Sequence, residues 1–159
     1  MPNWCMNSAT ISGPVVVLEN IVEAIKQNKM LEHFAPIGDW EYGLAVDMWG
    51  TKWEPEDVAY DLDADAGELR VSFDSAWAPP VDAYNTAMDR LGVEIQADYY
   101  EPGMMFVGSF DNGNDMSFEV DFTDETWRDK LPQDMIDAWD LDYEYENYLE
   151  WNNEEEDME

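Results

Sequence analysis

The stretch VAYDLDADAGELRVSF, residues 58–73, holds two short runs in which apolar and polar residues alternate. The apolar positions of the two runs are Val58, Tyr60, Leu62, Leu69, Val71 and Phe73. Alternation with a period of two is typical of β-strands that bury one face. Residues 63–67, between the runs, favour turns. The stretch therefore predicts a β-hairpin.

One helix is predicted on each side of this hairpin. Residues 15–29 carry an apolar stripe at helical spacing, made of Leu18, Ile21, Val22 and Ile25. Lys26 and Lys29 lie near its C-terminal end, where positive charge suits the helix dipole. The second helix begins after Pro79-Pro80 and ends at Gly92, because Pro suits a first helical turn and Gly a helix end.

Further strands are predicted from the same alternation over residues 5–12, 93–99, 104–110 and 116–122. Residues 31–55 are rich in Gly, Pro and Trp and predict an ordered loop with short helical turns. Through about residue 99 the elements follow the order β-α-β-β-α-β, which is that of the ferredoxin-like fold. We therefore predict an α+β fold with a ferredoxin-like sheet extended by one or two antiparallel strands.

The chain has thirty-eight acidic and seven basic residues and a net charge of -31. Residues 124–159 alone contain fifteen acids, opposed only by Arg128 and Lys130. A field of this sign repels nucleic acid and anionic lipid and attracts basic surfaces. Disordered acidic chains are poor in aromatic residues, whereas this one has eight Trp, eight Tyr and six Phe. The composition predicts a folded protein that binds neither nucleic acid nor membranes directly.

The composition changes after Thr123, so we predict a ferredoxin-like domain over 1–123 and an acidic helical appendage over 124–159. A short helix over 124–130 would be capped by Thr123. From Asp134 on, apolar residues recur at helical spacing, namely Ala138, Leu141, Tyr145 and Tyr148. This pattern predicts one amphipathic acidic helix, followed by a frayed or disordered tail over 152–159.

No catalytic or metal-binding pattern in the sequence is complete. Cys5 and His33 are the only residues of their types, and we expect a buried Cys5 and a hydrogen-bonded structural His33 rather than a nucleophile pair. Asp61, Asp63 and Asp65 resemble the start of a calcium loop, but the required Gly and Glu are missing. The sequence therefore predicts no metal, no cofactor and no enzymatic activity.

Four aromatic motifs occur in order: PNWC at 2–5, WGTKW at 49–53, AWAPP at 76–80 and YEPGMMFVG at 100–108. They resemble the motifs of the YubB-like (Api-type) family of small ferredoxin-fold proteins carried by phages and plasmids. The last motif departs from the family pattern, because Tyr100, Glu101 and Gly103 stand at compressed spacing before Phe106. The resemblance covers about residues 1–110. It implies the fold and a mobile-element origin, and no reaction or ligand.

The motif tryptophans Trp4, Trp49, Trp53 and Trp77 have two interpretations. We expect them to pack as one aromatic cluster that holds the long loop on the sheet, with Lys52 paired to a nearby acid, because aromatic burial strongly stabilises a small domain. The alternative interpretation is a pocket for a small molecule or a peptide.

Nothing in the sequence indicates export. A single Cys forms no internal disulfide. The first residues lack the basic and apolar regions of a signal peptide, and the apolar run at 15–18 is far too short to span a bilayer. We expect a soluble cytoplasmic protein, acting in the host cell cytoplasm if a phage encodes it.

The leading hypothesis for function is mimicry of nucleic acid. A helix over 134–157 would be about 36 Å long and carries eleven acids, about one per 3.3 Å, close to the roughly 3.4 Å between phosphates along one DNA strand. It would occupy the basic, nucleic-acid-binding surface of a host defence or transcription protein. The acids expected to form this surface are Asp134, Asp137, Asp140, Asp142, Glu144, Glu146, Glu150, Glu154, Glu155 and Glu156.

Alternatives to mimicry remain open. A virion structural or assembly protein would use the acidic helix as a docking segment. A salt-adapted accessory protein would carry its acids without any partner, although adaptation should distribute them over all faces. A homodimer is compatible with mimicry, since two acidic helices would present two rows of negative charge.

Overall fold

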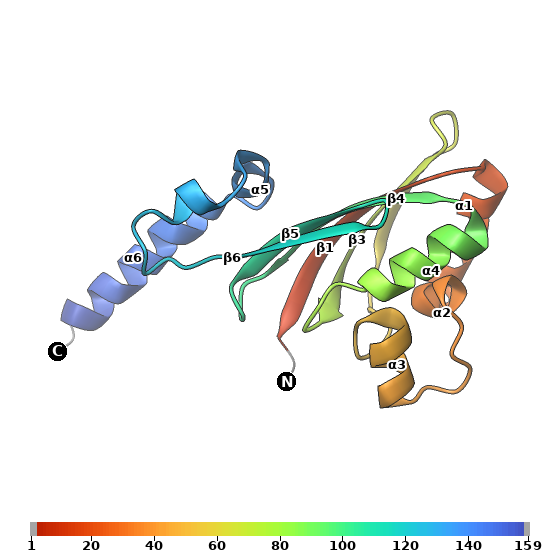
Figure 1. The fold of residues 1–159 in the computed structure, drawn as a ribbon, viewed down its shortest axis with the longest axis horizontal. Coiled ribbons are helices and arrows are strands. Elements are labelled where there is room, and N and C mark those ends of the chain that lie inside the picture. Colours follow the sequence, from red (N-terminus) through yellow and green to blue (C-terminus); the bar gives the residue numbers. More distant parts are fainter. Residues whose placement is uncertain (1–2, 158–159) are drawn as a thin grey trace. The chain divides into compact units, whose positions relative to one another are not determined.

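The computed structural model describes the backbone of residues 3–157 and the side chains of residues 3–152. The chain divides into two compact units, Met1–Ser117 and Phe118–Glu159, which we describe separately (Figure 1). This division precedes the predicted boundary at 123/124 by six residues. Within the described residues, no helix combines the length and the apolar character needed to cross a membrane.

The first unit is built on a six-stranded antiparallel sheet. Its strands are β1 (Trp4–Ser12), β2 (Ala59–Asp63), β3 (Glu68–Ala76), β4 (Glu94–Glu101), β5 (Phe106–Asp111) and β6 (Asn114–Glu119), the last of which continues into the second unit. Neighbouring strands follow the order β2-β3-β1-β4-β5-β6. The first four are in ferredoxin-like order, and β5 and β6 extend the sheet beyond β4. The predicted fold class is confirmed.

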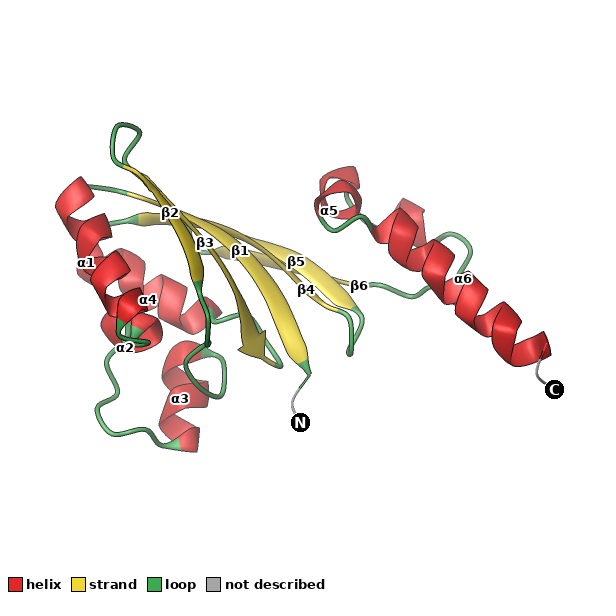
Figure 2. Cartoon of the chain, turned by 180° about the vertical axis from the view of Figure 1, so that it is seen from behind, coloured by secondary structure: helices red, strands yellow, loops and turns green. Residues whose placement is uncertain are grey.

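The helices of the first unit are α1 (Val15–Lys26), α2 (Met30–Phe34), α3 (Tyr42–Trp49) and α4 (Val81–Leu91). Figure 2 shows α1, α2 and α4 on one face of the sheet. Strand residues such as Ile11, Leu69 and Val71 are buried in the core on this face, whereas Ser8 and Ser72 are exposed. The period of two in the sequence therefore decides which face of the sheet is buried.

The hairpin of β2 and β3 is unequal in length. β2 has five residues and β3 has nine. The last residue pair between the two strands is Ala59 with Ser72. On the other side of β3, β1 pairs as far as Ala76. The edge of β3 from Phe73 onward therefore lies beyond the end of β2.

The segment over 31–55, predicted as an ordered loop with short helical turns, contains α3 and all of α2 except its first residue. The Glu54 carboxylate accepts the backbone N–H groups of Leu31 and Glu32 at 2.7 and 2.9 Å, which satisfies free donors at the start of α2. The indole of Trp49, in α3, donates to the carbonyl of Ala35 at 2.8 Å. These contacts between distant residues explain why short helices form where the local sequence favours a loop.

The second unit contains a short 3-10 helix, η1 (Trp127–Lys130), followed by α5 (Gln133–Ala138) and α6 (Leu141–Asp157). The prediction of one continuous helix from Asp134 is wrong, because the chain turns at Asp140, whose φ of 48° is left-handed. The prediction of a frayed tail is wrong up to Asp157, which is helical, and residues 158–159 lie outside the described residues.

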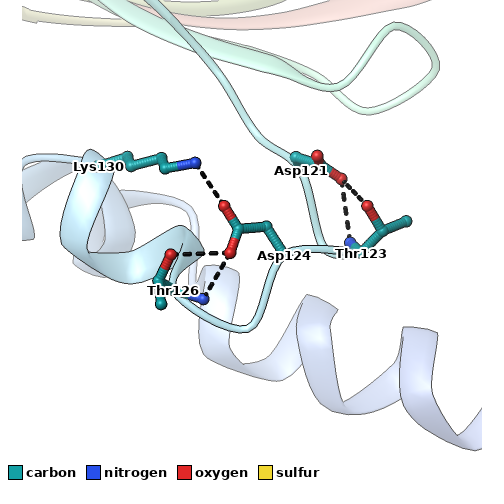
Figure 3. A network of polar contacts seen from close by, with 5 residues as sticks. All are labelled: Asp121, Thr123, Asp124, Thr126 and Lys130. Carbon is teal, nitrogen blue, oxygen red and sulfur yellow. Dashed lines mark hydrogen bonds and ion pairs between the residues drawn. The ribbon is translucent and has the colours of Figure 1, made fainter.

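Thr123 does not cap the short helix as predicted, since η1 begins after Thr126. The backbone N–H and hydroxyl of Thr123 donate to the Asp121 carboxylate. The same two groups of Thr126 donate to Asp124 (Figure 3). The chain thus turns through two successive Asp-x-Thr turns, in which an Asp side chain binds the backbone two residues on.

Candidate functional site

The second unit is held together by the aromatic side chains of Phe122, Trp127, Tyr145 and Tyr148. The ring centroid of Phe122 lies 5.1 Å from that of Trp127, 5.4 Å from Tyr145 and 5.7 Å from Tyr148. Aromatic pairs at such distances each add about 0.5–1.5 kcal/mol beyond the burial of their surface. The residues of the predicted stripe on α6 therefore do dock the helix.

Both basic residues of the second unit bind carboxylates of the same unit. Arg128 pairs with Asp142, and its guanidinium carbon lies 4.8 Å from the ring centroid of Trp127. Lys130 pairs with Asp124, and this hydrogen bond lowers the pKa of Asp124 and raises the pKa of Lys130 (Figure 3). Among the described residues, no other acid of the unit forms an ion pair.

The predicted acidic residues lie on α5, on α6 and at the junction between them. The exposed ones are Asp134, Asp137, Asp140, Glu146 and Glu150, and the half-buried ones are Asp142 and Glu144. Glu154, Glu155 and Glu156 lie in the helical backbone of α6, and their side chains are outside the described residues. The continuous 36 Å helix does not exist. However, α6 alone carries eight acids in seventeen residues, about one per 3.2 Å of helix axis.

Asp142 and Glu144 lie in the first turn of α6 and suit the helix dipole, but the remaining charges on α6 oppose helix formation. Asp142, Glu146 and Glu150 follow one another at four-residue intervals, and like charges at this spacing destabilise a helix by about 0.2–0.5 kcal/mol per pair. Residues 154–157, near the C-terminal end, are all acidic, and the helix dipole disfavours negative charge there. Aromatic contacts therefore hold α6 against its own electrostatics, and positive charge from a partner would relieve this repulsion.

Two aromatic side chains on α6 are exposed, and the sequence reasoning missed them. Tyr143 is 57% and Trp151 is 60% exposed. They are eight residues apart, so a period of 3.6 places them within about 80° of each other around the helix. Their exposure could have been predicted from the sequence, because neither residue belongs to the apolar stripe of Leu141, Tyr145 and Tyr148. Exposed Tyr and Trp side chains often anchor protein interfaces.

The four motif tryptophans do not form one cluster. Trp49 is buried in the main core. The rings of Trp4 and Trp53 instead pair where β1 begins, with a centroid distance of 6.4 Å. The ammonium of Lys52 lies 4.3 Å from the ring centroid of Trp53 and 5.4 Å from that of Trp77. Lys52 forms no ion pair with any residue that the structure describes, so cation–π contacts take the place of the expected pair.

Buried polar residues build the corner of the first unit at this end of the sheet, among them Glu101 of the last motif. The buried Asn7 amide donates to the Ser75 hydroxyl at 2.8 Å. The Glu101 side chain is fully buried, and its carboxylate accepts the backbone N–H groups of Gly103 and Met104, each at 2.7 Å. A buried carboxylate needs such hydrogen bonds, so Glu101 and Gly103 of the last motif have a structural explanation.

Cys5 and His33 occupy different environments. Cys5 is fully buried, as predicted, and burial together with the nearby Glu101 raises the pKa of its thiol to about 12. His33 lies on α2, where burial and the nearby Arg90 lower its pKa. Its Nε2 is buried and makes no hydrogen bond within the described residues, so the expected hydrogen bond is absent at this atom. The described part of the chain contains no group of three or more His, Cys, Asp or Glu side chains placed to hold a metal ion.

Native Cys5 is expected to resist alkylation. A rise of its pKa from 9.0 to about 12 lowers the reactive thiolate fraction about a thousandfold at mildly alkaline pH. The same shift makes the folded state lose stability as the pH rises from about 9 towards 12, because only the unfolded thiol ionises readily there. Iodoacetamide labelling, followed by mass spectrometry, should be fast in guanidinium chloride and at least about a hundredfold slower in the native protein. Equal rates would contradict the burial of this thiol.

No protein-family profile matches the chain, and no curated protein is significantly similar to it. The crystal structure of a protein Api92 from Yersinia pseudotuberculosis is similar at 22% sequence identity, with a TM-score of 0.39. The match covers 58% of this chain and 36% of that chain, so this chain spans about a third of the length of that protein. At this identity the likeness concerns the fold alone.

Proposed function

We propose that this protein uses its acidic second unit to bind the basic, nucleic-acid-binding surface of a host protein, and so mimics nucleic acid. The observation that supports this most directly is the distribution of ion pairs. Arg128 and Lys130 are both bound within the unit, while the carboxylates of Asp140, Glu146 and Glu150 are exposed and form no ion pair with any described residue. A surface of this sign attracts basic proteins and repels nucleic acid itself.

Carboxylates are effective substitutes for phosphates on such a surface. The guanidinium group of arginine matches both carboxylate and phosphate with a two-pronged hydrogen bond. The aromatic core around Phe122 holds α6 in place before any partner arrives, which reduces the ordering cost of binding. We include in this proposal that the protein belongs to the YubB-like family and originates from a phage or plasmid. The target would then be a host defence or transcription protein.

A virion assembly protein that docks through α6 is the second candidate. The exposed Tyr143 and Trp151 favour it, because mimicry of phosphates alone needs no aromatic anchors. The two candidates differ in their partner. DNA should displace the partner of a mimic and leave an assembly partner bound, and a chain without any partner would indicate adaptation to salt.

Neutralising three exposed acids of the second unit should weaken binding to a partner captured from host lysate. In the variant Asp140→Asn/Glu146→Gln/Glu150→Gln, we expect about tenfold weaker binding, from about 0.5 kcal/mol per lost charge, and a shallower dependence of affinity on salt. Calorimetric titrations over a range of salt concentrations measure both. The helix should remain folded, since the repulsion between Glu146 and Glu150 is removed.

The matched control removes the same charge from the first unit. Asp39, Asp47 and Asp61 are exposed, and none of them forms an ion pair among the described residues. Their combined replacement by Asn should leave the affinity nearly unchanged, whereas deletion of residues 124–159 should abolish binding. Equal losses in both triple variants would indicate a mere effect of net charge. Undiminished binding by the truncated protein would overturn the proposal.

A further inference from the structure

A surface hollow of about 390 Å³ opens beside Trp4 in the first unit. Its lining consists of Trp4, Glu56, Asp57, Ser72, Phe73 and Asp74. The strand register explains its position, since β2 pairs with β3 only as far as Ser72. Beyond that point the loop before β2, rather than a strand, flanks the edge of β3.

The lining combines two aromatic residues, the exposed Trp4 and the buried Phe73, with three acids and has no basic residue. Trp4 is 41% exposed. Glu56, Asp57 and Asp74 are also exposed, and none of them forms an ion pair within the described residues. Such a hollow favours a cation with a flat apolar face.

The protein already contains this combination once, with its cation in place. In the second unit, the guanidinium of Arg128 lies 4.8 Å from the ring centroid of Trp127 and pairs with the carboxylate of Asp142. The hollow offers a Trp ring and carboxylates without an arginine. The neighbouring Lys52 lies over the rings of Trp53 and Trp77.

We propose that this hollow binds a guanidinium group supplied from outside the chain. A guanidinium is planar, so it can stack on the Trp4 ring while its N–H groups bond to the carboxylates. An ammonium carries a compact, strongly hydrated charge and gains less from such a site. The proposal does not depend on the acidic second unit, so it stands or falls separately from the proposed function.

The test is a titration of the full chain with N-acetyl-arginine amide, in which the NMR signal of the Trp4 indole reports binding. The loss of one signal in Trp4→Leu assigns it. N-acetyl-citrulline amide is the neutral control of the same shape, and N-acetyl-lysine amide is the ammonium control. We expect a saturable shift of the Trp4 signal and about tenfold weaker binding of the citrulline compound, because it lacks the charge. Equal binding of the arginine and citrulline compounds would overturn the proposal.

Matched variants separate this site from general attraction by an acidic protein. Trp4→Leu keeps every carboxylate and, with binding measured by calorimetry because the indole signal is lost, should weaken binding of the arginine compound about three- to fivefold. Asp57→Asn/Asp74→Asn should weaken it about tenfold, and Asn tolerates the left-handed φ of 54° at residue 57. Asp61 is outside the hollow, so Asp61→Asn should have no effect. If neither site variant weakens binding although both melt like the native protein, the hollow is not the site.

The guanidinium can come from a protein side chain or from a free small molecule. Two further probes distinguish these sources, namely the pentapeptide Ala-Ala-Arg-Ala-Ala and methylguanidine. Tighter binding of the peptide would indicate an arginine side chain of a partner protein. Tighter binding of methylguanidine would indicate a free guanidino compound, and failure of both to shift the Trp4 signal would overturn the proposal.

Discussion

Phe122→Ala is expected to unfold the second unit and to leave the first unit folded. The Phe122 ring contacts Trp127, Tyr145 and Tyr148, and it is only 8% exposed. Removal of a buried Phe side chain costs about 3–5 kcal/mol. A unit of about forty residues buries little apolar surface and has a stability of only about 3–5 kcal/mol at best. The repulsion between Glu146 and Glu150 reduces that margin further.

Hydrogen exchange measured by mass spectrometry tests this prediction segment by segment. In Phe122→Ala, the amides of α6 should exchange at nearly the rate of an unfolded chain, while those of β1 and β4 stay protected. Leu149→Ala is the matched control, because Leu149 also lies on α6 but is 42% exposed, and its loss should change stability by less than about 0.5 kcal/mol. Persistent protection of α6 in Phe122→Ala would show that the aromatic cluster does not hold the helix.

Gly108→Ala is expected to destabilise the first unit by about 3 kcal/mol, at the upper end of the usual cost of overpacking. A Cβ atom at this position would lie 2.3 Å from the ring and hydroxyl of Tyr99 and 2.5 Å from the carbonyl oxygen of Met116. Tyr99 pairs directly with Gly108 across β4 and β5. Its ring cannot easily move, since it is 2% exposed and its hydroxyl donates to Asp115 at 2.6 Å.

Chemical unfolding monitored by circular dichroism measures this loss. Gly43→Ala is the control, because Gly43 lies in α3 and the added Cβ atom would meet only the Glu41 carboxylate, at an ordinary contact distance of 3.5 Å. It should stabilise the helix by about 0.5–1 kcal/mol, owing to the higher helix propensity of Ala. If the clash is the cause, Tyr99→Leu should cost less in the Gly108→Ala background than in the native chain. An unchanged unfolding midpoint of Gly108→Ala would refute the close packing of this strand pair.

The elements of the first unit follow from local patterns in the sequence. The period of two identifies β2 and β3, and the stripe at helical spacing identifies α1 and α4. Given the order β-α-β-β-α-β, right-handed crossovers leave few possible arrangements of the strands, so the ferredoxin-like order could be predicted. For residues 31–55 the sequence predicted short helical turns, but not the bounds of α2 and α3, because these helices depend on bonds from Glu54 and Trp49 to residues far away in the chain.

The break between α5 and α6 also escaped prediction. The apolar stripe continues from Ala138 to Leu141 without a change of period, and the turn residue Asp140 is one of many acids in the segment. An Asp enters the left-handed region only at a small cost. Docking of Leu141, which is fully buried, can therefore decide the turn against a weak local preference.

By itself, the sequence determined the fold class, the strongly negative charge and its concentration near the C-terminal end, because periodicity and composition are properties of the chain alone. Only the tertiary structure decided which charges and rings are free. In the folded protein, Arg128 pairs with Asp142 and Lys130 with Asp124. Trp49 is buried in the core, whereas Trp4 is exposed beside three acids. Ion pairs and exposure depend on residues that packing brings together from distant positions, and no local pattern records those contacts.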